Sequence, residues 1–316
     1  MIRFASRNGW VLGLVVLLVA LLVLTRLIQP GFGASGLQAL AAASLPFAFA
    51  TAGMAIVIIV GGIDLSIASM MAVASVVGAT LMDGATGTGS AFAVVAVLAI
   101  GIGMGALNGA LIVLTRVPDI VVTLAMLFVW EGVALLILNA PGGDAADWLR
   151  ALIAGGVVVG WLPAALVLLL VCVAIVWVPV VRSRIGLAIY ATGSDERAAF
   201  RSGVDVSRTR VIAYALAGLF AALGGLSLTM LTGIGEPIPG PYLLASVAAA
   251  VLGGVVLGGG KGGLLGPLIA VFILRIVRLD LTLLRVDPNV SAIVEGVIMV
   301  SVVMLGGLLA IRERRR

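Results

Sequence analysis

RSRIGLAIYATGSDERAAFRSGVDVSRTR, running from Arg182 to Arg210, is a polar segment between two apolar runs of about twenty residues. An apolar run of that length crosses a bilayer as a helix, because a helix satisfies its own backbone hydrogen bonds in lipid. A loop rich in arginine between two such helices stays on the cytoplasmic side. This stretch therefore predicts an all-α membrane protein with a cytoplasmic loop at about residues 182–210.

A short helix is expected inside this loop. Ser194 is a suitable N-cap residue, Asp195 and Glu196 place acids in the first turn, and Gly203 supplies a helix stop. A membrane protein that presents such a helix to the cytoplasm offers a docking surface. The plainer alternative is an ordinary solvated basic loop.

The composition extends this interpretation to the whole chain. Of the 316 residues, 62% are hydrophobic and 10% are charged, with a mean hydropathy of +1.30. These values predict one polytopic membrane domain over residues 1–316 and exclude a soluble globular protein. Because the chain shows no sizeable soluble domain at either end, any energy-converting domain is expected on another polypeptide.

Windows of about twenty apolar residues predict about ten transmembrane helices. Their approximate ranges are 10–28, 37–60, 66–82, 91–115, 120–138, 162–181, 209–232, 242–257, 264–278 and 290–311. The eighth and ninth ranges are short and rich in glycine, so each is either a complete span or a half-helix. An interfacial helix is expected around Ala145 to Leu152, and Gly235 to Pro241 is too rich in proline for a helix.

The distribution of positive charge favours both termini in the cytoplasm. An even number of crossings places the two termini on one side of the membrane. With that side in the cytoplasm, most of the 19 lysines and arginines lie inside, as the positive-inside rule requires. The basic residues left outside are Arg26, Arg150, Arg275, Arg278 and Arg285.

Several kinds of chemistry are excluded by the residues that the chain lacks. It has no histidine and one cysteine, Cys172, so it can hold no histidine metal site, Ser-His-Asp triad or internal disulfide. The glycines of 258–263 lack the spacing and the Ser or Thr of a phosphate-binding loop. We therefore expect no enzyme activity, no metal and no bound cofactor. The net charge of +5 comes from helix ends and does not indicate nucleic-acid binding.

Three polar residues are candidates for lining a transport pathway, because such groups are costly inside a bilayer. Asp64 lies in the sequence GGIDLS, Gly61 to Ser66, where a helix break is expected. It is either a buried N-cap of the next helix, a role open to Ser66 too, or a hinge or polar lining at the inner mouth of the transport pathway. Asn108 either bonds to a neighbouring helix or lines the pathway. Glu131 must face a partner, face a wet cavity, or become protonated.

Four sequence blocks resemble, in the same order, those of the ribose/xylose/arabinose-type permeases of ABC transporters. They are GGIDLS (61–66), LNGALIVLTRVPDIVVTLAM (107–126), IYATGSDERAAFRSGVDVSRTR (189–210) and AAAVLGGVVLGGGKGGLLGP (248–267). The resemblance covers nearly the whole chain. It implies an ABC importer permease bundle of ten helices in the bacterial inner membrane, with many passes and N-in, C-in topology.

The same resemblance implies the partners and the coupling site. A permease of this kind pairs with a second permease, identical or related, and lies in membrane lipid. Two ATP-binding subunits, or a fused tandem ATPase, bind the ATP and Mg, and a periplasmic sugar-binding protein delivers the substrate. The ATPase-coupling residues would be Gly193, Ser194, Asp195, Glu196, Arg197, Ala198, Ala199, Phe200 and Gly203.

The expected function is import of a monosaccharide or related polyol, driven by ATP hydrolysis on the partner. The chain departs from the family at Glu131, where many members have a basic residue, and at 244–246, where an aspartate often stands. The substrate is therefore open, and a branched-chain amino acid, a nucleoside or a signalling molecule is an alternative. An ion-coupled secondary transporter is another alternative, although Glu131 has no obvious acidic companion.

Overall fold

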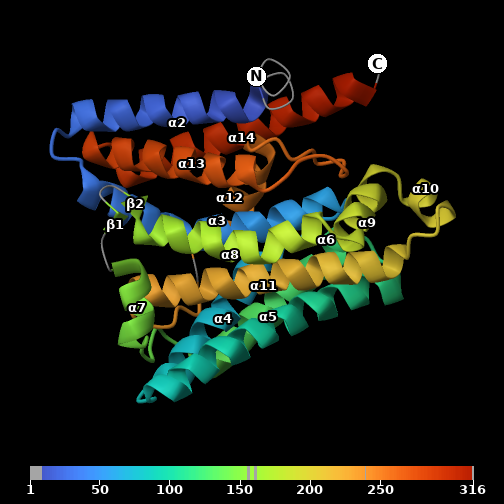
Figure 1. The fold of residues 1–316 in the computed structure, drawn as a ribbon, viewed down its shortest axis with the longest axis horizontal. Helices are drawn as coiled ribbons and strands as arrows, with labels where there is room; N and C mark the ends of the chain where they lie inside the picture. The colour runs from blue at the N-terminus through green and yellow to red at the C-terminus, as the bar shows by residue number, and fades with distance from the viewer. Residues whose placement is uncertain (1–8, 155–156, 160–161, 239, 315–316) are drawn as a thin grey trace.

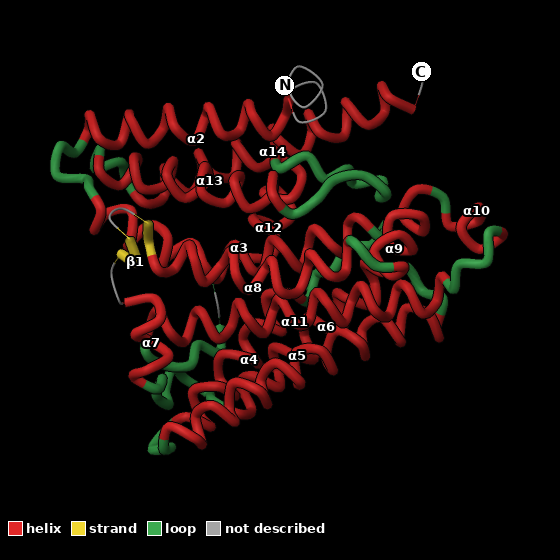
Figure 2. Tube along the Cα trace, viewed as in Figure 1, coloured by secondary structure: helices red, strands yellow, loops and turns green. Residues whose placement is uncertain are grey.

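The computed structural model describes residues 9–154, 157–159, 162–238 and 240–314. Its helices are α2 (Gly9–Ile28), α3 (Ala34–Ile59), α4 (Ile67–Met82), α5 (Gly87–Thr115), α6 (Asp119–Ile137), α7 (Asp147–Ala154), α8 (Ala164–Val181), α9 (Arg184–Ser194), α10 (Glu196–Arg201), α11 (Val206–Thr232), α12 (Tyr242–Leu252), α13 (Leu265–Leu283) and α14 (Pro288–Arg314). Within the described residues, the one sheet is a short antiparallel pair, β1 (Val157–Val159) and β2 (Leu162–Pro163). Figure 2 confirms the predicted all-α class.

Each predicted apolar range coincides with a helix whose boundaries differ by a few residues. In the described part of the chain, six helices are long and apolar enough to cross a membrane: α2, α3, α5, α6, α8 and α11. The apolar helices α4 and α12 are shorter, and so is the stretch Pro288–Ile298 of α14. The helix expected around Ala145 to Leu152 is α7, and its interfacial position stays a prediction. The total of ten crossings stays a prediction, as does the charge bias, since the arginines of 1–8 and 315–316 lie outside the described residues.

Helix α3 is the centre of the molecule (Figure 1). Its side chains from Ser44 to Ile59 are all buried, so protein surrounds this half of the helix on every side. Helix α11 packs against α3, α4 and α5, while α12 and α13 cover another side of α3 and α2 lies against α13. This arrangement fixes the position of the helix break that follows α3.

Helices α5 and α11 approach each other through glycine. A Cβ atom added at Gly105 would lie 2.0 Å from the Tyr214 carbonyl oxygen, and one added at Gly218 would lie 2.1 Å from the Gly101 carbonyl oxygen. Close backbone packing of this kind holds helices together in lipid, where apolar side chains gain little by association. These glycines let α5 and α11 pack closely, whereas Gly103 faces open space.

The start of α2 lies on the same side of the bundle as α9. The indole Nε1 of Trp10 donates a hydrogen bond to the Leu252 carbonyl at 2.8 Å, next to the loop that follows α12. That loop reaches α9, where the Tyr190 hydroxyl donates to the Gly262 carbonyl at 2.8 Å. Helix α14 also ends toward α9 and α10 (Figure 1). The two ends of the described chain therefore lie on one side, while the cytoplasmic location of that side stays a prediction.

Candidate functional site

The predicted cytoplasmic loop folds into the two short helices α9 and α10 before α11 begins. Side-chain oxygens of Ser183, Asp195 and Asp205 cap the three helices by accepting backbone N–H groups of the first turn. The Ala198 N–H, for example, donates to Asp195 Oδ1 at 2.9 Å. Because the caps satisfy donors that would otherwise lack partners, the loop presents an ordered surface and not a solvated coil.

The N-cap of α10 is Asp195, and the prediction that Ser194 caps this helix is wrong. Ser194 is the last residue of α9, and its hydroxyl donates to the Tyr190 carbonyl four residues back at 2.8 Å. Asp195 instead has the extended backbone (φ −160°, ψ 104°) that an N-cap residue needs. Glu196 lies in the first turn, as the sequence predicts.

Helix α10 stops at Gly203, as predicted. Gly203 has a φ of +84°, which costs an L-residue with a side chain strain that glycine avoids. Its N–H donates to the Phe200 carbonyl at 3.0 Å, and the Val204 N–H donates to the Ala199 carbonyl at 3.0 Å. This pair of bonds is a Schellman motif, which satisfies carbonyls at the end of the helix.

Most of α10 faces outward. Ala199 and Gly193 are buried, and the other candidate coupling residues are exposed: Ser194, Asp195, Glu196, Arg197, Ala198, Phe200 and Gly203. The side chain of Phe200 is 71% exposed beside a surface hollow that it helps to line. Glu196 forms an ion pair with Arg210 at 2.8 Å, which ties α10 to α11. A fixed, exposed aromatic ring beside charged groups suits a protein docking surface.

The end of α9 is pressed against two glycine-rich segments. A Cβ atom at Gly193 would lie 1.9 Å from the Ile59 carbonyl oxygen and 2.6 Å from the Gly260 nitrogen. The Gly260 N–H donates to that same Ile59 carbonyl at 2.8 Å. We name this contact of the end of α3, the end of α9 and loop 258–263 the glycine junction. It joins two of the four sequence blocks, 189–210 and 248–267, to the end of α3 through backbone atoms.

Tyr190 adds a side-chain bond to the glycine junction. Its hydroxyl donates to the Gly262 carbonyl at 2.8 Å, so α9 is held to the loop at a second point. Burial raises the pKa of this phenol above its ordinary value. The hydroxyl therefore keeps its proton at neutral pH and remains a donor.

The break between α3 and α4 is built as the sequence predicts. Gly61 has a φ of +95°, and the N–H groups of Gly61 and Gly62 donate to carbonyls in the last turn of α3. Asp64 is fully buried, and its Oδ1 accepts bonds from the Ser66 N–H at 2.9 Å and the Ser66 hydroxyl at 2.6 Å. Its Oδ2 has no hydrogen-bond partner among the described residues. Asp64 thus closes the turn before α4 from a buried position, with one oxygen unused, and the N-cap residue of α4 is Ser66.

A chain of side-chain hydrogen bonds connects this break to two other helices. Trp130 Nε1 of α6 donates to Asn108 Oδ1 at 3.2 Å, and Asn108 Nδ2 of α5 donates to the Ser66 hydroxyl at 2.7 Å. The Ser66 hydroxyl in turn donates to Asp64. Two of the predicted pathway residues, Asp64 and Asn108, are therefore brought together, and Asn108 has the interhelical role that was one of its alternatives.

A second polar group lies beside the break and was missed in the sequence. The Tyr214 hydroxyl of α11 donates to Asp119 Oδ2 at 3.0 Å, and the Thr123 hydroxyl of α6 donates to the Ile63 carbonyl at 3.2 Å. One signal was available, because a tyrosine within an apolar helix usually finds a partner for its hydroxyl. Within the described residues, no group of three or more His, Cys, Asp and Glu side chains could hold a metal ion.

Glu131, the third predicted pathway residue, is apart from this cluster. Its neighbour Trp130 points into the hydrogen-bond chain, while Glu131 is half-buried and forms no hydrogen bond or ion pair with the described residues. It lies in α6, a helix apolar enough to cross a membrane. A carboxylate in that setting needs water, a proton or a group from another chain.

Comparison with known proteins places the chain among permeases. Residues 36–303 match the family described as branched-chain amino acid transport system / permease component. The chain is 30% identical over 296 residues to the ribose import permease protein of Escherichia coli (strain K12), covering 92% of each. It is 32% identical over 256 residues to the ribose import permease protein of Bacillus subtilis (strain 168), covering 80% of this chain and 79% of the relative.

A third relative has a different named cargo. The chain is 28% identical over 313 residues to the autoinducer 2 import system permease protein of Escherichia coli (strain K12), covering 94% of this chain and 92% of the relative. No solved structure gives a significant match. The extent of these matches confirms the resemblance seen in the four sequence blocks, and the chain belongs to the sugar-importing permease family of ABC transporters.

Proposed function

We propose that this chain is the membrane permease subunit of a binding-protein-dependent ABC importer. It translocates a monosaccharide or related polyol across the bacterial inner membrane, and ATP hydrolysis on a separate subunit drives the transport. The observation that carries the proposal is α10, an exposed helix with a cap, a stop and a protruding Phe200. The names of two relatives, both ribose import permeases, support a monosaccharide as the substrate.

The glycine junction suggests how movement would reach the pathway. An ATPase that pushes on α10 would move α9, because Asp195 joins the two helices directly. The end of α9 contacts the end of α3 through backbone atoms, with no flexible side chain between them. The helix break at Asp64 follows α3 at once. We infer that displacement of α10 shifts the break relative to α5 and α6 and so opens or closes the inner end of the pathway.

The proposed complex contains a second permease, identical or related, and either two ATP-binding subunits or a fused tandem ATPase. A periplasmic binding protein would bring the substrate to the outer face. Glu131 has no partner among the described residues, which supports a contact or a wet pathway along α6, because a carboxylate on a membrane helix is unstable against lipid. The large exposed apolar side chains Phe128 and Leu136 lie on the same helix.

A signalling molecule is the second candidate substrate. The observation that favours it is the similarity to the autoinducer 2 import permease over nearly the whole chain. The family description likewise keeps a branched-chain amino acid as a candidate. Binding proteins that co-purify with the complex can be screened with ribose, autoinducer 2 and leucine, and the ligand that stimulates ATP hydrolysis identifies the cargo class.

The docking role is tested with Phe200→Ala in the complex reconstituted in nanodiscs. Removing a central aromatic anchor from a protein interface costs about 2 kcal/mol or more, so we expect binding-protein-stimulated ATP hydrolysis to fall about tenfold or further. The matched control is Phe92→Ala, because Phe92 on α5 is 70% exposed and Phe200 is 71% exposed. Full stimulation in Phe200→Ala would contradict the docking role. Uptake that follows an ion gradient after ATP depletion would favour a secondary transporter.

A further inference from the structure

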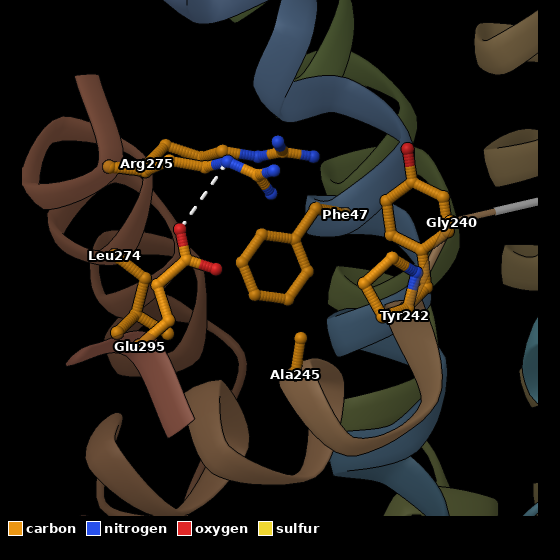
Figure 3. A pocket seen from close by; sticks show the side chains of 9 residues that line it. Phe47, Gly240, Tyr242, Ala245, Leu274, Arg275 and Glu295 are labelled. Atoms are coloured by element: carbon orange, nitrogen blue, oxygen red, sulfur yellow. Dashed lines mark ion pairs between the residues drawn. The ribbon is translucent and has the colours of Figure 1, made fainter. Parts of the chain in front are cut away.

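A pocket lies between α3, α12, α13 and α14, away from the hydrogen-bonded cluster at Asp64. Its volume is about 250 Å³. Figure 3 shows Phe47 at its centre, with Tyr242 on one side and Glu295 on the other, and with Arg275 extending past the ring. Ala245 at the base is small and leaves the space open. The pocket therefore combines aromatic walls with charged groups.

The two arginines in this pocket differ in whether a carboxylate pairs with them. Arg278 Nε lies 3.3 Å from Glu295 Oε1, so that guanidinium has a carboxylate partner. The guanidinium carbon of Arg275 lies 5.4 Å from the centre of the Phe47 ring, which offers weaker stabilisation than an anion. The Nε of Arg275 is buried and has no hydrogen-bond partner among the described residues. Among the described residues, the positive charge of Arg275 thus has no carboxylate partner and is left for a ligand.

The aromatic walls of the pocket suit a ligand that contains a small ring. The rings of Phe47 and Tyr242 are tilted by 42° with their centres 6.4 Å apart, so they form an angled apolar surface. Aromatic faces with a few convergent polar groups are typical of small-molecule sites. A guanidinium binds carboxylate and phosphate oxygens most strongly, because its N–H groups match their geometry.

We propose that this pocket binds a hydroxylated small molecule that carries an anionic oxygen group, either a carboxylate or a phosphate. The anionic group accepts hydrogen bonds from Arg275, and the rest of the molecule lies against Phe47 and Tyr242. The same chemistry could come from a transported solute or from the head group of a phospholipid at this helix-lined site. The statement that this ligand is the transported substrate rests on the proposed function. The statement that the pocket binds the ligand does not.

The test measures binding to the full-length permease in nanodiscs of phosphatidylcholine, without an ATPase. Radiolabelled glucuronate is the probe, and unlabelled glucose is the neutral competitor. We expect saturable binding of glucuronate that glucose displaces poorly. Arg275→Gln should weaken the affinity about tenfold to a hundredfold, the usual range for a lost hydrogen bond to a charged group. Arg275→Lys should retain more of it because the charge remains.

Glu295→Gln should change the affinity for glucuronate in the opposite direction. Loss of this carboxylate makes the pocket more positive, so glucuronate should bind more tightly, whereas a site for neutral polyols would lose an acceptor and bind more weakly. Arg150→Gln is the control, since Arg150 is an exposed arginine outside the pocket. Thermal unfolding of each variant shows whether it is folded.

A second series of nanodiscs contains phosphatidylglycerol and separates the two sources of the anion. Competition by this lipid in the wild type, lost in Arg275→Gln, would identify a phospholipid head group as the ligand. No effect of the lipid on glucuronate binding would identify a solute. Equal displacement by glucose, or absence of saturable binding to folded protein, overturns the proposal. Loss of ATPase stimulation in the complex would contradict the proposed function and leave this binding result standing.

Discussion

Asp64 shows how one side chain can hold two separable roles. Its Oδ1 accepts both hydrogen bonds from Ser66, and its Oδ2 has no partner among the described residues. The amide carbonyl of an asparagine can replace Oδ1 as the acceptor for Ser66, because it also accepts hydrogen bonds. The hydrogen bonds that close the turn at the helix break can therefore be kept while the charge is removed.

We expect Asp64→Asn to keep the free energy of unfolding within about 1 kcal/mol of the wild-type value, because the bonds from Ser66 persist. Asp64→Ala should lower it by about 1–3 kcal/mol, since the buried Ser66 N–H loses its acceptor. Unfolding of the detergent-solubilised protein measures both values. An asparagine variant as unstable as the alanine variant would show that the fold needs the charge. A stable asparagine variant that fails to transport would give the carboxylate a role in the pathway.

Among the elements, α5 and α11 depend on the absence of side chains at their contact. Gly105 of α5 and Gly218 of α11 allow the two backbones to meet. Gly103, also on α5, faces open space. The three positions share the same helical conformation, so propensity alone treats them alike. Their different surroundings separate the effect of packing from that of helix propensity.

Gly105→Ala should destabilise the protein by about 1–3 kcal/mol or more, because the new methyl group would overlap the Tyr214 carbonyl and push the helices apart. Gly103→Ala should be neutral or stabilise by up to about 1 kcal/mol, because alanine favours a helix. Thermal unfolding of the two variants in one detergent gives the comparison. Equal stability of the two variants would refute the close contact between α5 and α11.

The elements were largely predictable from the sequence, and their partners were not. Apolar length marks a membrane helix wherever it occurs, so the predicted ranges coincide with helices. The cap of α10 was misplaced by one residue because Ser194 and Asp195 both suit a cap, and the bond from Ser194 to Tyr190 that decides between them arises only once α9 exists. The bond between Tyr214 and Asp119 joins positions far apart in sequence, which no local pattern encodes.

At the scale of the whole molecule, the predicted topology assigns one side of the bundle to the cytoplasm. The single cysteine, Cys172, makes this accessible to experiment, because its replacement leaves a chain without reactive thiols. Asp83, between α4 and α5, and Arg201, in α10, are both exposed. The N-in, C-in arrangement puts Asp83 outside and Arg201 inside.

We therefore expect Asp83→Cys, in a Cys172→Ala background, to react with a membrane-impermeant maleimide added to intact spheroplasts. Arg201→Cys should react only after the membrane is permeabilised. The readout is the mass shift of the purified protein. The reverse pattern would invert the topology and remove α10 from reach of a cytoplasmic ATPase.

The glycine junction also bears on redesign of the molecule. Main-chain atoms make most of its contacts, with the Gly260 N–H on the Ile59 carbonyl and Gly193 against both, and the Tyr190 hydroxyl adds one side-chain bond. The hydrogen bond from Gly260 uses backbone atoms alone, and it requires glycine at position 193, because a Cβ atom there would overlap the Ile59 carbonyl. Ile59, Gly193 and Gly260 lie outside the pocket at Phe47 and Arg275, so we expect exchanges in that pocket to leave the junction intact. Variants of the docking helix α10 and variants of the pocket can therefore be made and combined as separate modules of one protein.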